Sequence, residues 1–337
     1  MRKVLKKIII FAGMVFLLTG CASNQTTPPA QDNTTEDVQE EIVVNIAALT
    51  GPTAIGMIKM IDEEPSLGEN VATNYEMVQT PDILVSKLLS GEFDFSALPS
   101  NLAATLYNRG AGYQLLAMNT WGVLYVVSSD DSISSWNDLQ GRTVNAFGLG
   151  ATPDVVLRYL LSENGVDPEA DLTIDYSIPQ TEIAAAMIAG RIDTALLPEP
   201  MVTMVIAQNS GLKIVLDLQE EWQAINGQDI PMAQGSLVVR EEFAKNNPEI
   251  VAGFLERYKE SIEWVNVNTA EAGVLVEKHN VGMPAKIAER AIPRSNIRFM
   301  TAIEAKPSVE SYLEVLFNFS PQTVGGKLPD EAFYYVD

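Results

Sequence analysis

Apolar and polar positions along this chain group into segments that predict strands alternating with helices. Short runs rich in Val and Ile are typical of buried strands, and longer segments with one apolar face are typical of helices. Strands are predicted at 42–49, 73–79, 93–98, 114–118, 123–128, 143–147, 172–176, 192–197, 214–216 and 233–239. Helices are predicted at 54–61, 82–89, 101–107, 155–163, 180–189, 248–267, 270–278, 286–292 and 309–317, and residues 220–229 are expected to form a loop. This order is typical of an α/β fold.

One pattern occurs twice along the chain. Residues 88–100 read LLSGEFDFSALPS, and residues 187–200 read MIAGRIDTALLPEP. In each copy a glycine, Gly91 or Gly190, suits the left-handed conformation that ends a helix, and the apolar run after it predicts a buried strand. The residues after that strand are expected at its carboxyl end, where open α/β sheets bind ligands. The repeat favours two α/β lobes with a cleft, although two ordinary helix-to-strand connections would look the same.

The first residues of the chain read as a targeting signal. Basic residues precede an apolar run at 8–18, which is well short of the roughly 20 residues that a spanning helix needs. The run ends in Leu-Thr-Gly-Cys, which resembles a bacterial lipobox, so residues 1–20 are predicted to be a signal peptide and Cys21 to be lipidated. Residues 21–41 are poor in apolar residues and are predicted to form a disordered tether.

Charge and composition exclude several classes of function. The net charge of −22 argues against nucleic acid or an anionic surface as a partner. Cys21 is the only cysteine and His279 the only histidine, so the parts of Ser-His-Asp and Cys-His catalysis are missing. His279 is expected at a helix end, and no metal-ligand spacing stands out. We therefore expect no metal, no cofactor and no enzymatic activity.

Candidate ligand contacts are the small and polar residues that follow predicted strands. A helix begins near Thr53, and its free N–H groups favour acceptors or anions, although Thr53 would also serve as a simple N-cap. The turn before Thr152, the expected N-cap of the next helix, carries only two glycines of a dinucleotide motif. Trp121 is either a stacking surface or a core indole. The full set of candidates is Gly51, Pro52, Thr53, Ser100, Asn101, Asn119, Trp121, Gly150, Ala151, Thr152 and Glu199.

The chain resembles the solute-binding lipoproteins of ABC importers. The resemblance rests on the lipobox, the two repeated units, the segment DLQGRTV at 138–144, and Phe243 with the Asn-Pro-Glu that follows it. It is most similar to the nitrate, sulfonate, taurine and thiamine-precursor branch. This implies the type II periplasmic-binding-protein fold, an α/β fold in which each of two lobes is a mixed sheet flanked by helices. Lobe one maps to 42–121 plus 236–337 and lobe two to 122–235, with two crossing segments between them.

The resemblance implies a monomer that closes over a small solute and delivers it to an ABC permease. It also implies a place on the extracytoplasmic face of the membrane, anchored through Cys21. Glu199 at a strand end, with no Arg at any candidate strand end, favours a neutral or cationic heterocycle over a sulfonate or nitrate; a pyrimidine or thiamine-like precursor stacked on Trp121 or Tyr107 would fit. Alternatively, Glu199 simply complements a helix dipole.

Two other classes of function remain open. A lipoprotein that senses its ligand without transporting it would show the same sequence features. An enzyme of pyrimidine or menaquinone synthesis on the same fold is disfavoured by the export signal and by the missing His and Cys residues. The helices after residue 242 are expected to pack and not to catalyse.

Overall fold

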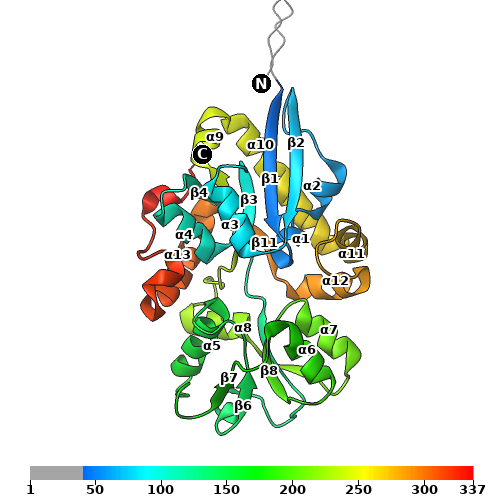
Figure 1. Cartoon of the computed structure of the whole chain (residues 1–337), viewed down its shortest axis with the longest axis vertical. Helices are drawn as coiled ribbons and strands as arrows, with labels where there is room; N and C mark the ends of the chain where they lie inside the picture. The colour runs from blue at the N-terminus through cyan, green and yellow to red at the C-terminus, as the bar shows by residue number, and fades with distance from the viewer. Residues whose placement is uncertain (1–40, 337) are drawn as a thin grey trace, which may run out of the picture. The chain divides into compact units, whose positions relative to one another are not determined.

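The structure is a computed structural model that describes residues 41–336. Two mixed sheets flanked by helices make up this part of the chain, which confirms the predicted α/β fold (Figure 1). Both sheets lie within one compact unit. The predicted signal peptide, Cys21 and nearly all of the predicted tether lie outside the described residues. Within 41–336, none of the helices combines the length and the apolar character that a membrane span requires.

The first sheet has six strands. In the order in which they pair, they are β11 (Ile297–Thr301), β4 (Tyr113–Thr120), β10 (Gly235–Arg240), β3 (Phe95–Pro99), β1 (Ile42–Leu49) and β2 (Val71–Val78). β1 runs parallel to β2 and β3, whereas β10 is antiparallel to β3 and β4, and β11 is antiparallel to β4. We call this sheet and the helices packed on it lobe one.

The second sheet has five strands. Their order is β7 (Thr173–Asp175), β6 (Thr143–Asn145), β8 (Thr194–Pro198), β5 (Leu124–Ser128) and β9 (Lys213–Asp217). β6 pairs in parallel with β7 and β8, and β5 is antiparallel to β8 and β9. We call this sheet and its helices lobe two.

The helices are divided between the two lobes. Figure 1 shows four of them grouped with the second sheet: α5 (Thr152–Glu163), α6 (Gln180–Ile188), α7 (Met201–Gln208) and α8 (Leu218–Asn226). The others are α1 (Pro52–Ile55), α2 (Ile58–Glu63), α3 (Pro81–Leu89), α4 (Ser100–Asn108), α9 (Glu241–Asn246), α10 (Pro248–Val267), α11 (Thr269–Lys278), α12 (Ala285–Ala291) and α13 (Ala302–Phe319). Short 3₁₀ turns lie at Trp136–Leu139, Ile292–Arg294, Pro321–Val324 and Glu331–Phe333.

The period of apolar residues in α10 correctly predicted which face of this helix is buried in lobe one. Its predicted apolar stripe is buried, and Phe254 on that stripe stacks on Phe95 of β3 with ring centroids 4.1 Å apart. His279 ends α11, as expected, and its Nε2 lies 2.7 Å from a carboxylate oxygen of Asp62.

The repeated unit forms the same structure in both lobes. Gly91 and Gly190 have φ angles of 74° and 64°, the left-handed conformation expected after a helix. The strand after each glycine, β3 or β8, ends at the proline of the repeat. Each strand has a parallel neighbour on one side and an antiparallel neighbour on the other, so the sheets are mixed.

Several local predictions were wrong or incomplete, and helix α7 was not predicted at all. Most of the expected loop at 220–229 is helix α8, because the Asp217 side chain accepts a hydrogen bond from the N–H of Gln219 (2.9 Å) and so starts a helix there. Strand β11 was missed because it is short and contains Arg298. Helix α13 begins seven residues earlier than expected, because a capping box at Thr301 starts it ahead of Pro307.

The chain passes between the sheets at two places. The first crossing segment is 121–123, between β4 and β5, and the second is 227–234, between α8 and β10. The sequence boundaries proposed for the two lobes stay a prediction.

Candidate functional site

A pocket of about 510 Å³ is lined by residues of both lobes, and we call it the cleft. Leu49, Pro99 and Pro198 contribute the carboxyl ends of β1, β3 and β8 to its wall. Asn101 and Thr152 contribute the first turns of α4 and α5. The repeated unit therefore delivers a strand end to the cleft from each lobe, where α/β sheets bind ligands.

The walls of the cleft are mostly apolar and uncharged. Five prolines line it, together with aliphatic side chains and one phenylalanine: Pro52, Pro81, Pro99, Pro153, Pro198, Leu49, Leu102, Val123, Leu124 and Phe147. Glu199 is the one lining residue with an ionisable acidic or basic side chain. A ligand in this cleft would meet apolar surface with a few polar groups, which is typical of small-molecule sites.

Two buried hydroxyls in the cleft lack a well-formed hydrogen bond. Thr120 Oγ1 is buried without a partner among the described residues. The Tyr312 hydroxyl lies near Gln234 and Thr152 but makes no hydrogen bond of good geometry with either. Burial raises the pKa of Tyr312, so its hydroxyl stays protonated and is able to donate. Because buried polar groups are normally satisfied and both residues line the cleft, each hydroxyl is a candidate hydrogen-bond partner for a ligand.

Tyr312 reaches the cleft from α13, a late helix that we expected only to pack. Its ring packs edge-on against Trp222 of α8, with centroids 5.7 Å apart, and Trp222 also contacts Tyr159 of α5. The sequence did not indicate this position, because apolar periodicity does not show which end of a buried tyrosine lies at a cavity. Thr120 was also missed, although it lies between the candidates Asn119 and Trp121.

The carboxylate of Glu199 is already neutralised by a neighbour. Its side chain is fully buried, and Oε1 accepts a hydrogen bond from Nε of Arg294 at 2.5 Å. Thr203 donates to the same carboxylate from its N–H (3.1 Å) and from its hydroxyl (3.0 Å). Arg294, in the 3₁₀ turn before β11, also bonds to the Thr203 hydroxyl. The charge of Glu199, which we used to favour a cationic or neutral solute over an anion, is therefore already balanced by Arg294.

The cleft brings together six of the predicted contacts. These are Pro52, Thr53, Asn101, Ala151, Thr152 and Glu199. Neither threonine is the N-cap that we expected: Gly51 occupies that position before α1, and Ala151 before α5. The Thr53 hydroxyl instead donates to the carbonyl of Leu49 (3.0 Å).

The other candidates do not line the cleft. Ser100 and Asn119 are buried, and they donate to Ala233 O (2.5 Å) in the second crossing segment and to the Tyr258 hydroxyl (2.8 Å) of α10. The candidates outside the cleft lining are Gly51, Ser100, Asn119, Trp121 and Gly150. Trp121 lines a different pocket, described below, and Tyr107 bonds to Asp330, so neither residue offers a stacking surface to the cleft.

A buried carboxylate shapes the glycine-rich turn beside the cleft. Asp154 accepts a hydrogen bond from the N–H of Gly150 (2.7 Å) and another from Nε of Arg158 (2.6 Å), and Tyr176 donates to it as well. The turn therefore has a fixed geometry, which places Ala151 at the cleft. Gly150 takes part through this turn and not by direct contact.

Two glutamine side chains tie the crossing segments to each other. Gln219 Oε1 accepts from the N–H of Gly122 in the first segment (2.9 Å) and from the N–H of Met232 in the second (3.0 Å). Gln234 Oε1 accepts from the N–H of Val123 (2.8 Å). These bonds satisfy backbone groups that leave one sheet before joining the next.

We expect Gly122→Ala to lower the free energy of unfolding by about 2 kcal/mol, because no space exists for the added methyl group. A Cβ at Gly122 would lie 2.5 Å from Gln219 Oε1 and 2.7 Å from Met232 Cε. Urea denaturation would measure the loss. Gly211→Ala is the control, since a Cβ there meets only the Asn209 side chain at 3.2 Å. Equal stability of the two variants would contradict the tight packing at the crossing.

Comparisons with known proteins place the chain in a family and agree with its fold. The NMT1-like family matches residues 73–278. YtlA of Bacillus subtilis (strain 168) is 23% identical over 244 residues, which are 69% of this chain and 70% of YtlA. A crystal structure of an ABC transporter from Parabacteroides distasonis matches with a TM-score of 0.74 and 26% identity, over 87% of this chain and 99% of that chain. The periplasmic aliphatic sulphonate binding protein SsuA from Escherichia coli matches with a TM-score of 0.66 and 17% identity, over 86% and 91%.

Proposed function

This chain belongs to the NMT1-like family, and from that premise we propose that it captures a small solute in the cleft and delivers it to an ABC permease. The observation that carries the proposal is a cleft lined by both lobes in which two residues, Thr120 and Tyr312, have buried hydroxyls without well-formed bonds. A solute that touches both lobes favours the closed population, because it binds that state better than a state with the lobes apart.

The lining of the cleft supports an uncharged solute. An anion would find no basic side chain among the lining residues, and a cation would find only Glu199, whose charge Arg294 already balances. A heterocycle such as a pyrimidine or a thiamine-like precursor fits the apolar walls, the Phe147 ring and the neutral polar groups of Thr120, Gln234 and Tyr312. A sulfonate, the ligand class named for SsuA, would need charged or N–H donors in place of these prolines.

A thermal-shift comparison tests the class of solute. We expect an aminopyrimidine to raise the unfolding midpoint of the full chain and ethanesulfonate or nitrate to leave it unchanged. At a concentration of about 100 times Kd, binding adds about 2.7 kcal/mol to the free energy of unfolding. A shift with ethanesulfonate alone would reverse the proposal on solute class and leave solute capture intact.

The site of action follows from the N-terminal sequence and the relatives. We propose that the chain is exported, is lipidated at Cys21 and works as a monomer on the extracytoplasmic face of the membrane. The signal-like residues 1–20 and the periplasmic location named for SsuA support this proposal.

A further inference from the structure

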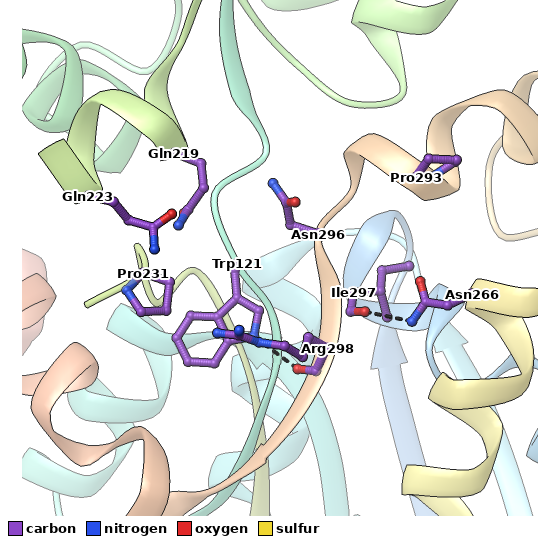
Figure 2. Close-up of a pocket in the computed structure, with 9 residues that line it drawn as sticks. All are labelled: Trp121, Gln219, Gln223, Pro231, Asn266, Pro293, Asn296, Ile297 and Arg298. Carbon is purple, nitrogen blue, oxygen red and sulfur yellow. Dashed lines mark hydrogen bonds between the residues drawn. The ribbon is translucent and has the colours of Figure 1, made fainter. Parts of the chain in front are cut away.

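A second pocket, of about 400 Å³, lies beside the two crossing segments, and we call it the hinge pocket (Figure 2). Neighbouring residues at the end of β4 and in the first crossing line different pockets, because Thr120 and Val123 line the cleft whereas Trp121 lines the hinge pocket. Gln219 and Gln223 of α8 form one side of the hinge pocket. Asn296, just before β11, and Arg298 in β11 form another. Its walls therefore come from both lobes.

The guanidinium of Arg298 is the charged group of the hinge pocket. Its central carbon lies 4.9 Å from the centre of the Trp121 ring, a cation–π contact, and the Trp121 indole N–H donates to the Arg298 carbonyl at 2.9 Å. Trp121 is buried and so provides a fixed base for the stack. Within residues 41–336 no carboxylate forms an ion pair with Arg298, although the chain carries 44 acidic residues. The planar guanidinium is thus oriented and available to a carboxylate.

Two carboxamides of the hinge pocket are oriented by bonds to the first crossing. Gln219 Oε1 accepts from Gly122 and Met232, and its Nε2 has no hydrogen-bond partner in the described part of the chain. Asn296 Nδ2 donates to the Gly122 carbonyl at 2.5 Å, which leaves its Oδ1 as an acceptor. Figure 2 shows these two amides on either side of the chain that carries Trp121. One fixed donor and one fixed acceptor accompany the cation.

We propose that the hinge pocket is a second small-molecule site, distinct from the cleft, that takes a small carboxylate carrying a hydroxyl or amino donor. The carboxylate pairs with the Arg298 guanidinium and accepts from Gln219 Nε2, and the donor of the ligand faces Asn296 Oδ1. None of these three residues lines the cleft, so the inference does not depend on the proposed solute.

Titration of the full chain with lactate tests the hinge pocket. The indole N–H signal of Trp121 is identified as the NMR signal that Trp121→Phe removes. We expect its chemical shift to change and saturate as lactate is added. Lactamide, the uncharged isostere, should leave the chemical shift unchanged. Isothermal titration calorimetry with the same two compounds gives a readout that does not depend on the indole. A response to lactamide equal to that of lactate, or no response to lactate by either method, would overturn the proposal.

Variants of Arg298 separate the site from a general effect of charge. Arg298→Gln should weaken lactate binding by at least about tenfold. Arg298→Lys should weaken it less, because lysine keeps the positive charge but lacks the planar guanidinium that binds a carboxylate through two N–H groups. Arg290→Gln is the matched control, since Arg290 is an exposed arginine on α12 that forms no ion pair in the described chain. Equal losses in Arg298→Gln and Arg290→Gln, or unchanged binding by Arg298→Gln, would contradict the site.

Discussion

Replacement of Arg294 by methionine should lower the free energy of unfolding by about 3 kcal/mol, at the low end of the cost of breaking a buried ion pair. The side chain of Glu199 has no solvent exposure, so in this variant its carboxylate would keep only the two bonds from Thr203. The side chain of Arg294 is 36% exposed, which places the expected cost at the low end of the range. Methionine retains most of the aliphatic stem, so little packing is lost.

Two further variants, Glu199→Gln and the double variant, test whether Glu199 and Arg294 stabilise the protein as a pair. Glu199→Gln should cost less than Arg294→Met, because glutamine still accepts from Thr203 while the freed Arg294 side chain reaches water. The double variant should be less damaging than the sum of the two single variants, with a coupling energy of about 1–3 kcal/mol. Urea denaturation of all four proteins measures these differences. Additive losses, or a larger loss for Glu199→Gln, would show that the pair does not act as described.

The second large effect is expected on solute affinity, from the two hydroxyls of the cleft. Tyr312→Phe and Thr120→Val should each weaken binding of the cleft solute by about tenfold, and together by about a hundredfold, since each removes one hydrogen bond to the ligand. The free protein should change in stability by less than about 1 kcal/mol, because neither hydroxyl has a well-formed bond to lose. Calorimetric titration and urea denaturation measure the two quantities separately.

Tyr113→Phe is the control for these variants. The Tyr113 hydroxyl is buried like that of Tyr312 but donates to the Phe93 carbonyl at 2.6 Å, away from the cleft. Its loss should reduce stability by about 1 kcal/mol and leave solute affinity unchanged. If Tyr113→Phe weakened binding as much as Tyr312→Phe, the effect on affinity would not be local to the cleft.

The sequence was sufficient to predict the α/β fold and the strand ends that lie at the cleft. Gly91 and Gly190 mark helix ends by a conformation that glycine adopts without strain, and the apolar run after each is long enough for only one buried strand. These local rules put Asn101 and Glu199 at the cleft without any knowledge of the rest of the chain.

The contacts that complete the site could not be predicted in the same way. Arg294 reaches Glu199 from 95 positions along the chain. Tyr312 reaches the cleft from α13, a lobe-one helix whose Tyr312 ring also contacts Trp222 of lobe two. Neither contact follows from local periodicity, because each depends on how separate elements pack in space. The error about the charge of Glu199 has this origin, since a strand-end carboxylate was judged without the arginine that tertiary structure supplies.

The pocket that Trp121 lines also could not be predicted from the sequence. Both interpretations of Trp121, a stacking surface in the cleft or a core indole, treated the crossing as having one functional side. The structure shows pockets on two sides of it, and alternate residues, Thr120 and Trp121, belong to different ones. Strand-like alternation would have separated these residues, but it could not indicate which side holds the solute.

Native mass spectrometry of the gently purified full chain tests the central claim, capture of a small solute in the cleft, most directly. The wild-type protein would be compared with the Thr120→Val, Tyr312→Phe double variant prepared in the same way. We predict one additional small mass on the wild-type protein that is largely lost from the double variant. The same mass on both proteins at equal occupancy would contradict the assignment of the cleft as the solute site.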